Sequence, residues 1–268
     1  MSPKHLIDLP RKKLSPHYYR ADCRACPRLA EFLESVRTRH PDYACRPVPS
    51  FGELGASLLI VGLAPGLHGA NATGRPFTGD HAGILLYQTL YKFGFSSAPD
   101  SHPGDDLVLE NCAVTNAVKC LPPQNKPIAS EVNTCRPFLV EELGTVPEGG
   151  VILALGKLAH DSVVRALGMR VSKVTFGHAS EYRVSGGRTL LSSYHCSRYN
   201  TQTGRLTGEM FENVFSRARD LLGCPMAINK AKAVKGLTRG PGVYVMRNGE
   251  QDVLYVGCLL YTSPSPRD

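Results

Sequence analysis

One stretch constrains the fold of this chain more than any other. Residues 58–62 read LLIVG, a short apolar run typical of a buried strand. The next residues, 63–80, read LAPGLHGANATGRPFTGD and combine glycine and proline with a few selected polar and aromatic side chains. Glycine lets a backbone approach a ligand closely. Because open α/β sheets bind ligands beyond the carboxyl ends of their parallel strands, this stretch predicts a binding loop in such a sheet.

Strands and helices are predicted to alternate along the chain. This order favours an α/β fold, a three-layer α/β/α sandwich around a mostly parallel central sheet. The unusual loops follow predicted strands near 62, 115 and 194, so we expect them to meet at one edge of the sheet. Ser130 is the predicted N-cap of one helix. The predicted helices span 27–38, 82–94, 130–146, 157–168 and 207–223. Strands are predicted at 56–63 and 149–156, within 108–120 with a loop at the carboxyl end, and within 181–195 as two strands joined by a Gly-Gly turn.

Composition narrows the class of partner. The chain has 268 residues, 42% of them hydrophobic, which suffices for one sizeable domain and a small second one. No window is apolar over the length needed to cross a bilayer, and residues 1–20 lack the apolar core of a secretion signal, so we expect a cytoplasmic protein without a membrane partner. The net charge of +8 favours a polyanion, nucleic acid above all, with a merely soluble basic surface as the alternative.

The nine cysteines indicate metal binding or catalysis rather than a disulfide framework. Cys23 and Cys26 form the only CxxC pair, and Cys120 and Cys135 lie 15 residues apart. Tetrahedral thiolate sites suit zinc as well as iron–sulfur clusters, and the spacing does not choose between them. The thiols expected to be packing residues are Cys45, Cys112, Cys196 and Cys224.

Three ordered motifs carry a family resemblance over roughly residues 15–222. They are GLAPGLHGANATGRPFTGD (62–80), TNAVKC (115–120) and HCSRYNTQTGRLT (195–207). Together they resemble the iron–sulfur uracil-DNA glycosylases of the type 5 class, within the uracil-DNA glycosylase superfamily. The resemblance implies a DNA-repair hydrolase that removes uracil and leaves an abasic site, and a monomer is the default expectation for an enzyme that scans DNA. It also implies a 4Fe-4S cluster that clips the N-terminal segment to the 120–135 loop and is held by Cys23, Cys26, Cys120 and Cys135.

The resemblance assigns three residues to the chemistry. Cleavage of an N-glycosidic bond leaves positive charge on the sugar and negative charge on the departing base. Asn116 would read the base edge, since one carboxamide can meet both N3–H and O4 of uracil if it is held against flipping. His195 would stabilise the charge that develops at O2. Asp80 would position water or support the sugar cation, because Ala64 stands where many superfamily members carry an aspartate.

Further residues are expected to form the base pocket. Phe77 matches the aromatic residue that stacks on the flipped base. Gly66 replaces a bulky residue that elsewhere excludes the methyl group of thymine, so the resemblance implies a roomier pocket that also admits hypoxanthine. The pocket residues expected besides the catalytic three are Gly62, Ala64, Gly66, His68, Asn71 and Phe77.

The segment after His195 is expected to contact DNA. Ser197 and Arg205 would meet phosphates, and Arg198 or Tyr199 would fill the gap left by the flipped base. Cys196 stands where the family has proline, which would stiffen this turn. No lysine lies in the motifs as an obvious nucleophile, and Lys119 is expected to be a phosphate contact or a neighbour of the cluster.

A boundary is predicted near residue 225, separating a domain over 1–225 from a piece over 226–268. Residues 240–257, GPGVYVMRNGEQDVLYVG, predict two short strands and resemble the start of a GIY-YIG nuclease domain like that of an excinuclease. The arginine and glutamate that such a domain requires do not follow, so we expect this piece to be catalytically inactive. The final LLYTSPSPRD resembles translated adapter sequence.

Two other functions remain open on the sequence alone. One is a non-catalytic iron–sulfur module that binds DNA or senses lesions. The other is a nucleotide- or dinucleotide-binding α/β enzyme that uses the glycine-rich loop, although GLAPGLHG lacks the GxGxxG spacing.

Overall fold

The computed structural model describes residues 20–223 and the strands β7 (Gly242–Arg247) and β8 (Val253–Leu259). The chain forms two compact units, Met1–Ala227 and Ile228–Asp268. Cys224, the N-terminal residues 1–19 and the segments 224–241, 248–252 and 260–268 lie outside the described residues, and so do the sequence predictions that concern them.

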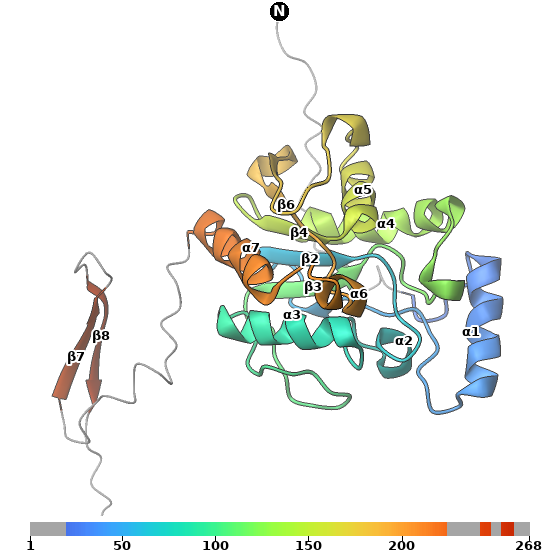
Figure 1. Cartoon of the computed structure of the whole chain (residues 1–268), viewed down its shortest axis with the longest axis horizontal. Helices are drawn as coiled ribbons and strands as arrows, with labels where there is room; N and C mark the ends of the chain where they lie inside the picture. Colours follow the sequence, from blue (N-terminus) through green and yellow to red (C-terminus); the bar gives the residue numbers. More distant parts are fainter. Residues whose placement is uncertain (1–19, 224–241, 248–252, 260–268) are drawn as a thin grey trace, which may run out of the picture. The chain divides into compact units, whose positions relative to one another are not determined.

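A six-stranded sheet organises the first unit, with the strand order β1-β3-β2-β4-β6-β5 (Figure 1). The four central strands, β3, β2, β4 and β6, pair in parallel, while β1 and β5 pair antiparallel at the two edges. The predicted mostly parallel sheet is therefore confirmed. The strands are β1 (Phe51–Gly52), β2 (Leu58–Gly62), β3 (Cys112–Asn116), β4 (Val151–Leu155), β5 (Glu181–Arg183) and β6 (Thr189–Ser193).

Helices cover both faces of this sheet, with α3 and α7 on one side and α4 and α5 on the other (Figure 1). Alternate residues of β2 pack against the two helix layers, because successive side chains of a strand point to opposite faces of the sheet. Ile60 packs with the α3 and α7 side chains, and Val61 packs with those of α4 and α5. The three-layer sandwich is thus confirmed. The helices are α1 (Pro27–Arg39), α2 (Ala70–Thr73), α3 (His81–Lys92), α4 (Ala129–Thr145), α5 (Lys157–Ala166), α6 (Arg198–Gln202) and α7 (Gly208–Leu221), with short 3₁₀ turns at Pro123–Asn125, Val171–Lys173 and Ser185–Gly187.

The strand register brings the loops after the parallel strands together. Gly62 of β2 pairs with Asn116 of β3, and the two chains stay joined beyond the strands, since the Ala117 N–H donates to the Gly62 carbonyl at 2.9 Å. On the other side of the sheet, the Gly156 N–H donates to the Ser193 carbonyl at 2.8 Å. The loops predicted to share one edge of the sheet therefore do so.

The N-cap of helix α4 lies two residues before the predicted one, so the prediction of Ser130 as its N-cap is wrong. The N-cap is Ile128, whose N–H donates to the carboxylate of Glu131 at 2.9 Å. That carboxylate also binds Arg28 of α1, with 2.7 Å between Arg28 Nε and Glu131 Oε1. Glu131 therefore joins a local capping bond to a contact with a distant segment, and this arrangement rather than a serine cap marks the helix start.

One further expectation is met by the described residues. Strands β7 and β8 pair antiparallel, with Val245 opposite Val256, as predicted for residues 240–257. Across the described part of the chain, no helix combines the length and the apolar character that crossing a membrane requires.

The start of α3 depends on Gly83. A Cβ at this position would lie 1.8 Å from the Phe77 carbonyl oxygen. Gly83→Ala would therefore push helix α3 away from the turn that contains Phe77. We expect this variant to lower the free energy of unfolding by about 3 kcal/mol in urea titrations. Gly144→Ala is the control, since Gly144 lies in the last turn of α4 with nothing within 4 Å of an added Cβ. It should gain up to about 1 kcal/mol, and equal losses in both variants would contradict this account.

Candidate active site

A pocket of about 640 Å³ lies at the carboxyl edge of the parallel strands. Its volume is within the range of about 300–1,000 Å³ usual for small-molecule sites. The loops after β2, β3 and β6 all contribute to its wall. The predicted site residues that line it are Ala64, Gly66, His68, Phe77, Asp80, Asn116, His195, Ser197 and Arg198.

Phe77 and Asn116 lie against each other over Gly62. A Cβ on Gly62 would come 2.4 Å from Asn116 Oδ1 and 2.7 Å from Phe77 Cζ, so only glycine fits at this position. Phe77 has a φ of 52°, a left-handed conformation that costs free energy for a residue other than glycine. The surrounding turn holds that conformation and directs the ring into the pocket. Gly62 therefore lies beneath the pocket and provides clearance for the residues that line it.

Asp80 has two roles in the geometry. It is the N-cap of α3, where its Oδ1 accepts from the Gly83 N–H at 3.0 Å. Its other oxygen, Oδ2, lies close to the loop after β2, because a Cβ on Gly69 would approach it to 2.4 Å and one on Gly66 to 3.5 Å. The positive end of the α3 dipole favours a negative charge here. The carboxylate is thus fixed at the pocket wall by the helix that it caps.

His195 lies opposite Phe77, with 6.0 Å between the ring centroids and 29° between the ring planes. The Asn200 side chain donates to the His195 carbonyl at 2.8 Å, so α6 holds the backbone that carries the imidazole. Burial lowers the pKa of His195 below its ordinary value, and the negative charge of Asp80 partly opposes this effect. The imidazole is therefore neutral near pH 7, with one N–H to donate.

Besides Gly62, three of the expected contacts lie outside this pocket. Asn71 is fully buried, and its amide donates to Cys45 Sγ at 3.6 Å and to the Leu67 carbonyl at 3.5 Å. It holds the loop rather than lining the pocket. Tyr199 is 70% exposed on α6, and the Arg205 guanidinium lies 4.7 Å from the centre of the Tyr194 ring. Both side chains remain accessible to a ligand outside the pocket.

Asn125 lines the pocket although the sequence reasoning did not identify it. It lies between Cys120 and Cys135 in the turn Pro123–Asn125, where Gln124 has a φ of 55° and Asn125 one of 57°. Two successive non-glycine residues in the left-handed region are unusual and occur most often at functional sites. The available signal was the segment PPQNKP, where asparagine follows a proline pair.

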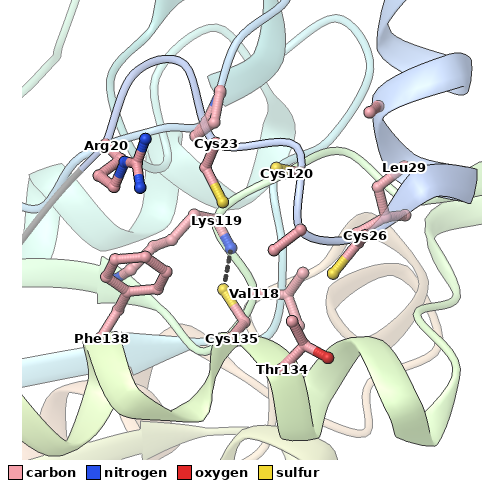
Figure 2. A pocket seen from close by; sticks show the side chains of 13 residues that line it. Arg20, Cys23, Cys26, Leu29, Val118, Lys119, Cys120, Thr134, Cys135 and Phe138 are labelled. Atoms are coloured by element: carbon pink, nitrogen blue, oxygen red, sulfur yellow. Dashed lines mark hydrogen bonds between the residues drawn. The ribbon is translucent and has the colours of Figure 1, made fainter.

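The four cysteines expected to act together surround a second cavity (Figure 2). Apolar side chains such as Leu29, Val118 and Phe138 complete its wall. The backbone N–H of Lys119 donates to Cys135 Sγ at 3.3 Å. The structure thus brings together thiols from two segments about 100 residues apart in the chain, and these thiols are Cys23, Cys26, Cys120 and Cys135.

The environment of three of these thiols favours their neutral form in the absence of a cation. Burial, together with the charges of the other cysteines, raises the pKa of Cys120 to about 12. Burial also raises the pKa of Cys26 and of Cys135. Within residues 20–223, no three side chains of histidine, cysteine, aspartate or glutamate group closely enough to hold one metal ion. The cysteines surround a volume rather than one point.

Two ion pairs support the cysteine cavity. Arg28 binds Glu131 through two contacts, at 2.7 and 2.8 Å, and so joins α1 to the first turn of α4. Lys119 is 3% exposed, and its Nζ contacts both carboxylate oxygens of Glu142 at 2.7 Å and the Thr115 hydroxyl at 2.5 Å. Lys119 is therefore a neighbour of the cysteine cavity, and its expected alternative role as a phosphate contact is wrong.

The remaining described thiols are packing residues, as predicted. Cys45 packs with Leu33 and Val36 of α1, and both Cys112 and Cys196 lie in the core beside α3 and α7. All three are fully buried. Cys196 therefore fills space in the core at the position where the resemblance expects proline.

Comparison with known proteins agrees with this geometry. The chain matches the model of the uracil DNA glycosylase superfamily over residues 49–219. It is 49% identical over 206 residues to the type-5 uracil-DNA glycosylase of Thermus thermophilus, covering 75% of this chain and 94% of that protein. It is 42% identical over 210 residues to the type-5 uracil-DNA glycosylase of Mycobacterium leprae, covering 75% and 92%. A type-4 uracil-DNA glycosylase of Pyrobaculum aerophilum is 34% identical over 157 residues, covering 57% of this chain and 72% of that protein.

With one pocket built from its three motifs and relatives that match it over nearly their whole length, the chain belongs to the type-5 class of the uracil-DNA glycosylase superfamily.

Proposed function

We propose that this chain hydrolyses the N-glycosidic bond of uracil in DNA and leaves an abasic site. The observation that carries the proposal is the convergence of Phe77, Asn116 and His195 from three separate loops on one pocket. A pocket of this kind takes a nucleotide that has been rotated out of the duplex. The names of the relatives, type-5 uracil-DNA glycosylases, support the choice of base.

The base is held by stacking and by its hydrogen-bonding edge. Its face stacks on the ring of Phe77, which the strained backbone already directs into the pocket. The Asn116 carboxamide accepts from N3–H and donates to O4, a pattern that uracil satisfies and cytosine reverses. The clearance that Gly62 provides lets the carboxamide occupy this position.

Bond cleavage then depends on charge. As the bond to the sugar breaks, electrons move onto the base, and neutral His195 donates a hydrogen bond to O2, where negative charge develops. Asp80 acts on the positive charge that develops on the sugar. Its carboxylate stabilises the cationic sugar and orients the attacking water. Water supplies the hydroxyl group that ends on the sugar, and its proton leaves to solvent or to the base.

The reaction needs no covalent intermediate with lysine. Lys119, the lysine of the TNAVKC motif, directs its Nζ into a buried contact with Glu142. A Schiff base requires a free amine at the sugar, and this amine is paired within the core. We therefore infer a monofunctional glycosylase. We also propose that it acts as a monomer, the default for an enzyme that scans DNA.

The space beside Gly66 extends the range of bases. The pocket wall at Gly66 carries no side chain, and the nearest group to an added Cβ there would be Asp80 Oδ2 at 3.5 Å. We infer that larger deaminated bases, hypoxanthine among them, enter the same pocket.

DNA is expected to bind across the mouth of the pocket, where α6 begins. Ser197 and Arg198 line the mouth, and Tyr199 and Arg205 lie exposed nearby. Arg205 and the Ser197 hydroxyl contact phosphates, while Arg198 or Tyr199 takes the place of the flipped base in the duplex.

The four cysteines fit a 4Fe-4S cluster better than a single zinc ion. A zinc ion draws its thiolates to about 2.3 Å, whereas these thiols surround a cavity and no three of the described side chains converge on one point. The apolar wall and the Lys119 N–H donated to Cys135 suit a buried iron–sulfur cluster. When bound, the cluster would supply no step of base excision. It would hold α1 against the 120–135 segment, in parallel with the Arg28–Glu131 pair.

Residues 226–268 contribute nothing to excision in this proposal. The antiparallel pairing of β7 and β8 supports a hairpin there, and its resemblance to a GIY-YIG domain rests on the sequence alone. A boundary near 225 separates this piece from the glycosylase. The intracellular compartment inferred for the protein is the cytoplasm.

Excision from defined duplexes tests the function. We expect release of uracil from a duplex with one U opposite G, and of hypoxanthine from one with hypoxanthine opposite T, measured in single turnover by alkaline cleavage of the abasic strand. Asn116→Ala should lower the rate constant about 100-fold or more. Asp80→Asn should lower it by about as much while preserving the cap of α3, because asparagine caps as well as aspartate.

The outcomes separate the candidate functions. Binding of the duplex without any excision would favour the non-catalytic module, and saturable binding of NAD or ATP would favour the nucleotide-binding enzyme. Release of uracil alone would contradict the inference from Gly66. Full activity in Asp80→Asn would show that Asp80 acts only as the cap of α3.

Iron analysis tests the cysteine site. We expect about four iron atoms and four sulfides per chain in anaerobically purified protein, and their loss in Cys120→Ser. The variant should melt roughly 5–10 °C lower, because the segment near α1 loses a covalent anchor. Cys112→Ala is the control, since this buried thiol lies in the core and should leave the iron content unchanged. One zinc per chain in the unaltered protein would overturn the cluster.

The pH dependence of excision tests the state of His195. Because the folded-state pKa of His195 is lower than the ordinary 6.5, the imidazole stays neutral as the pH falls to that value. The single-turnover rate should therefore be flat from about pH 8 to about pH 6.5 and fall only in more acidic solution. Stability follows the same direction, since protons bind more tightly to the unfolded chain, and it decreases as the pH falls through the ordinary histidine range. A rate that rises toward pH 6.5 would show instead that protonated His195 is the active form.

A further inference from the structure

Three aromatic side chains form a cluster at the rim of the pocket. His40 and Tyr43 stack with their ring centroids 4.6 Å apart and 14° between their planes. His68 stands perpendicular to both, at 5.9 Å from His40 and 6.0 Å from Tyr43. Of the three, His68 lines the base pocket. His40 and Tyr43 follow α1, so this cluster joins the N-terminal segment to the pocket loop.

The segment that carries Tyr43 is fixed to the pocket loop by its backbone. The Ala44 N–H donates to the Ala72 carbonyl at 3.0 Å, and the Cys45 N–H donates to the Asn71 carbonyl at 3.1 Å. The buried Asn71 amide adds a contact to Cys45 Sγ. These bonds set the position of the Tyr43 ring relative to His68, independently of any substrate.

The Tyr43 hydroxyl lies 2.8 Å from Nδ1 of His68. A phenol is a better donor than acceptor toward a neutral imidazole, so the hydroxyl proton is shared with Nδ1 and the ring proton of His68 resides on Nε2. An imidazole held in this tautomer offers an N–H donor through Nε2. The groups that line the same pocket from other elements include Asp80, His81 and His195.

We propose that Tyr43 is a positioning residue that holds His68 as the Nε2–H tautomer, so that His68 donates a hydrogen bond to an acceptor oxygen of the flipped nucleotide. The inference rests on the proposed function, since it takes a nucleotide as the occupant of the pocket. Although the segment after α1 contains none of the three motifs, it then influences the pocket through His68. Tyr43 acts through His68 and touches no reacting atom.

The first test removes one oxygen atom. Tyr43→Phe retains the ring and its stacking on His40 but loses the hydroxyl, and we expect the single-turnover rate of uracil excision to fall about three- to tenfold, the effect of one hydrogen bond. His68→Gln should lower the rate by at least as much. In the double variant, Tyr43→Phe should add nothing, because the group through which it acts is gone. Tyr91→Phe, at an exposed tyrosine of α3, is the matched control and should leave the rate unchanged.

The second test observes the tautomer directly in the full-length protein. Long-range proton–nitrogen spectra of histidine-labelled protein distinguish the two neutral tautomers, and the His68 signal is identified by its loss in His68→Gln. We expect the Nε2–H form in the unaltered protein and a mixture of tautomers in Tyr43→Phe. A change in stability alone would not alter this signal.

The outcomes are distinct from those that test the proposed function. Absence of uracil release by the unaltered protein would refute the glycosylase, while the tautomer signal would still report on the Tyr43–His68 bond. The inference itself is overturned if Tyr43→Phe leaves both rate and tautomer unchanged, if its effect persists in the His68→Gln background, or if His68→Gln excises at the full rate.

Discussion

Four parallel strands end at one edge of the sheet, and the rest of the site depends on that alignment. The loops contain little regular structure, so none of them defines a pocket alone. The register of β2 with β3 and of β4 with β6 fixes where each loop starts. Backbone bonds continue the pairing beyond the strands, as between Ala117 and Gly62. The pocket is therefore a property of the sheet, and the loops supply its chemistry.

Charge in this pocket is set by the helices as much as by the side chains. Asp80 caps α3, so its carboxylate lies where the helix dipole favours negative charge. His195 lies deep enough that burial keeps it neutral, although it faces that carboxylate. The two groups have opposite tasks in the proposed reaction, one toward a cationic sugar and one toward an anionic base. Their environments stabilise the charge states that those tasks require.

The sequence was informative where function follows directly from a strand end. Asp80, Asn116 and His195 lie in motifs just beyond predicted strands, and the structure brings all three to one pocket. It was misleading where a distant residue decides the outcome. The start of α4 depends on Glu131, whose partner Arg28 lies 103 residues away, and no local pattern reports such a pair.

The directions of side chains were a second source of difference between the sequence predictions and the structure. Asn71 lies in the predicted pocket loop, but its amide turns inward to Cys45. Asn125 and Tyr43 reach the pocket region from segments that the motifs do not include. The position of a residue along a loop can be predicted from sequence. The direction of its side chain depends on neighbours that only the folded chain provides.

Three glycines around the pocket illustrate how easily tolerance to mutation is misread. Side chains at Gly62, Gly69 and Gly83 would collide with Asn116, Asp80 and the Phe77 carbonyl, respectively. A saturation screen for activity would therefore reject nearly every replacement at these positions, as severely as at the polar residues that line the pocket. Intolerance there would record lost clearance around the side chains of the pocket, and a map of essential positions would include glycines that contribute space rather than chemistry.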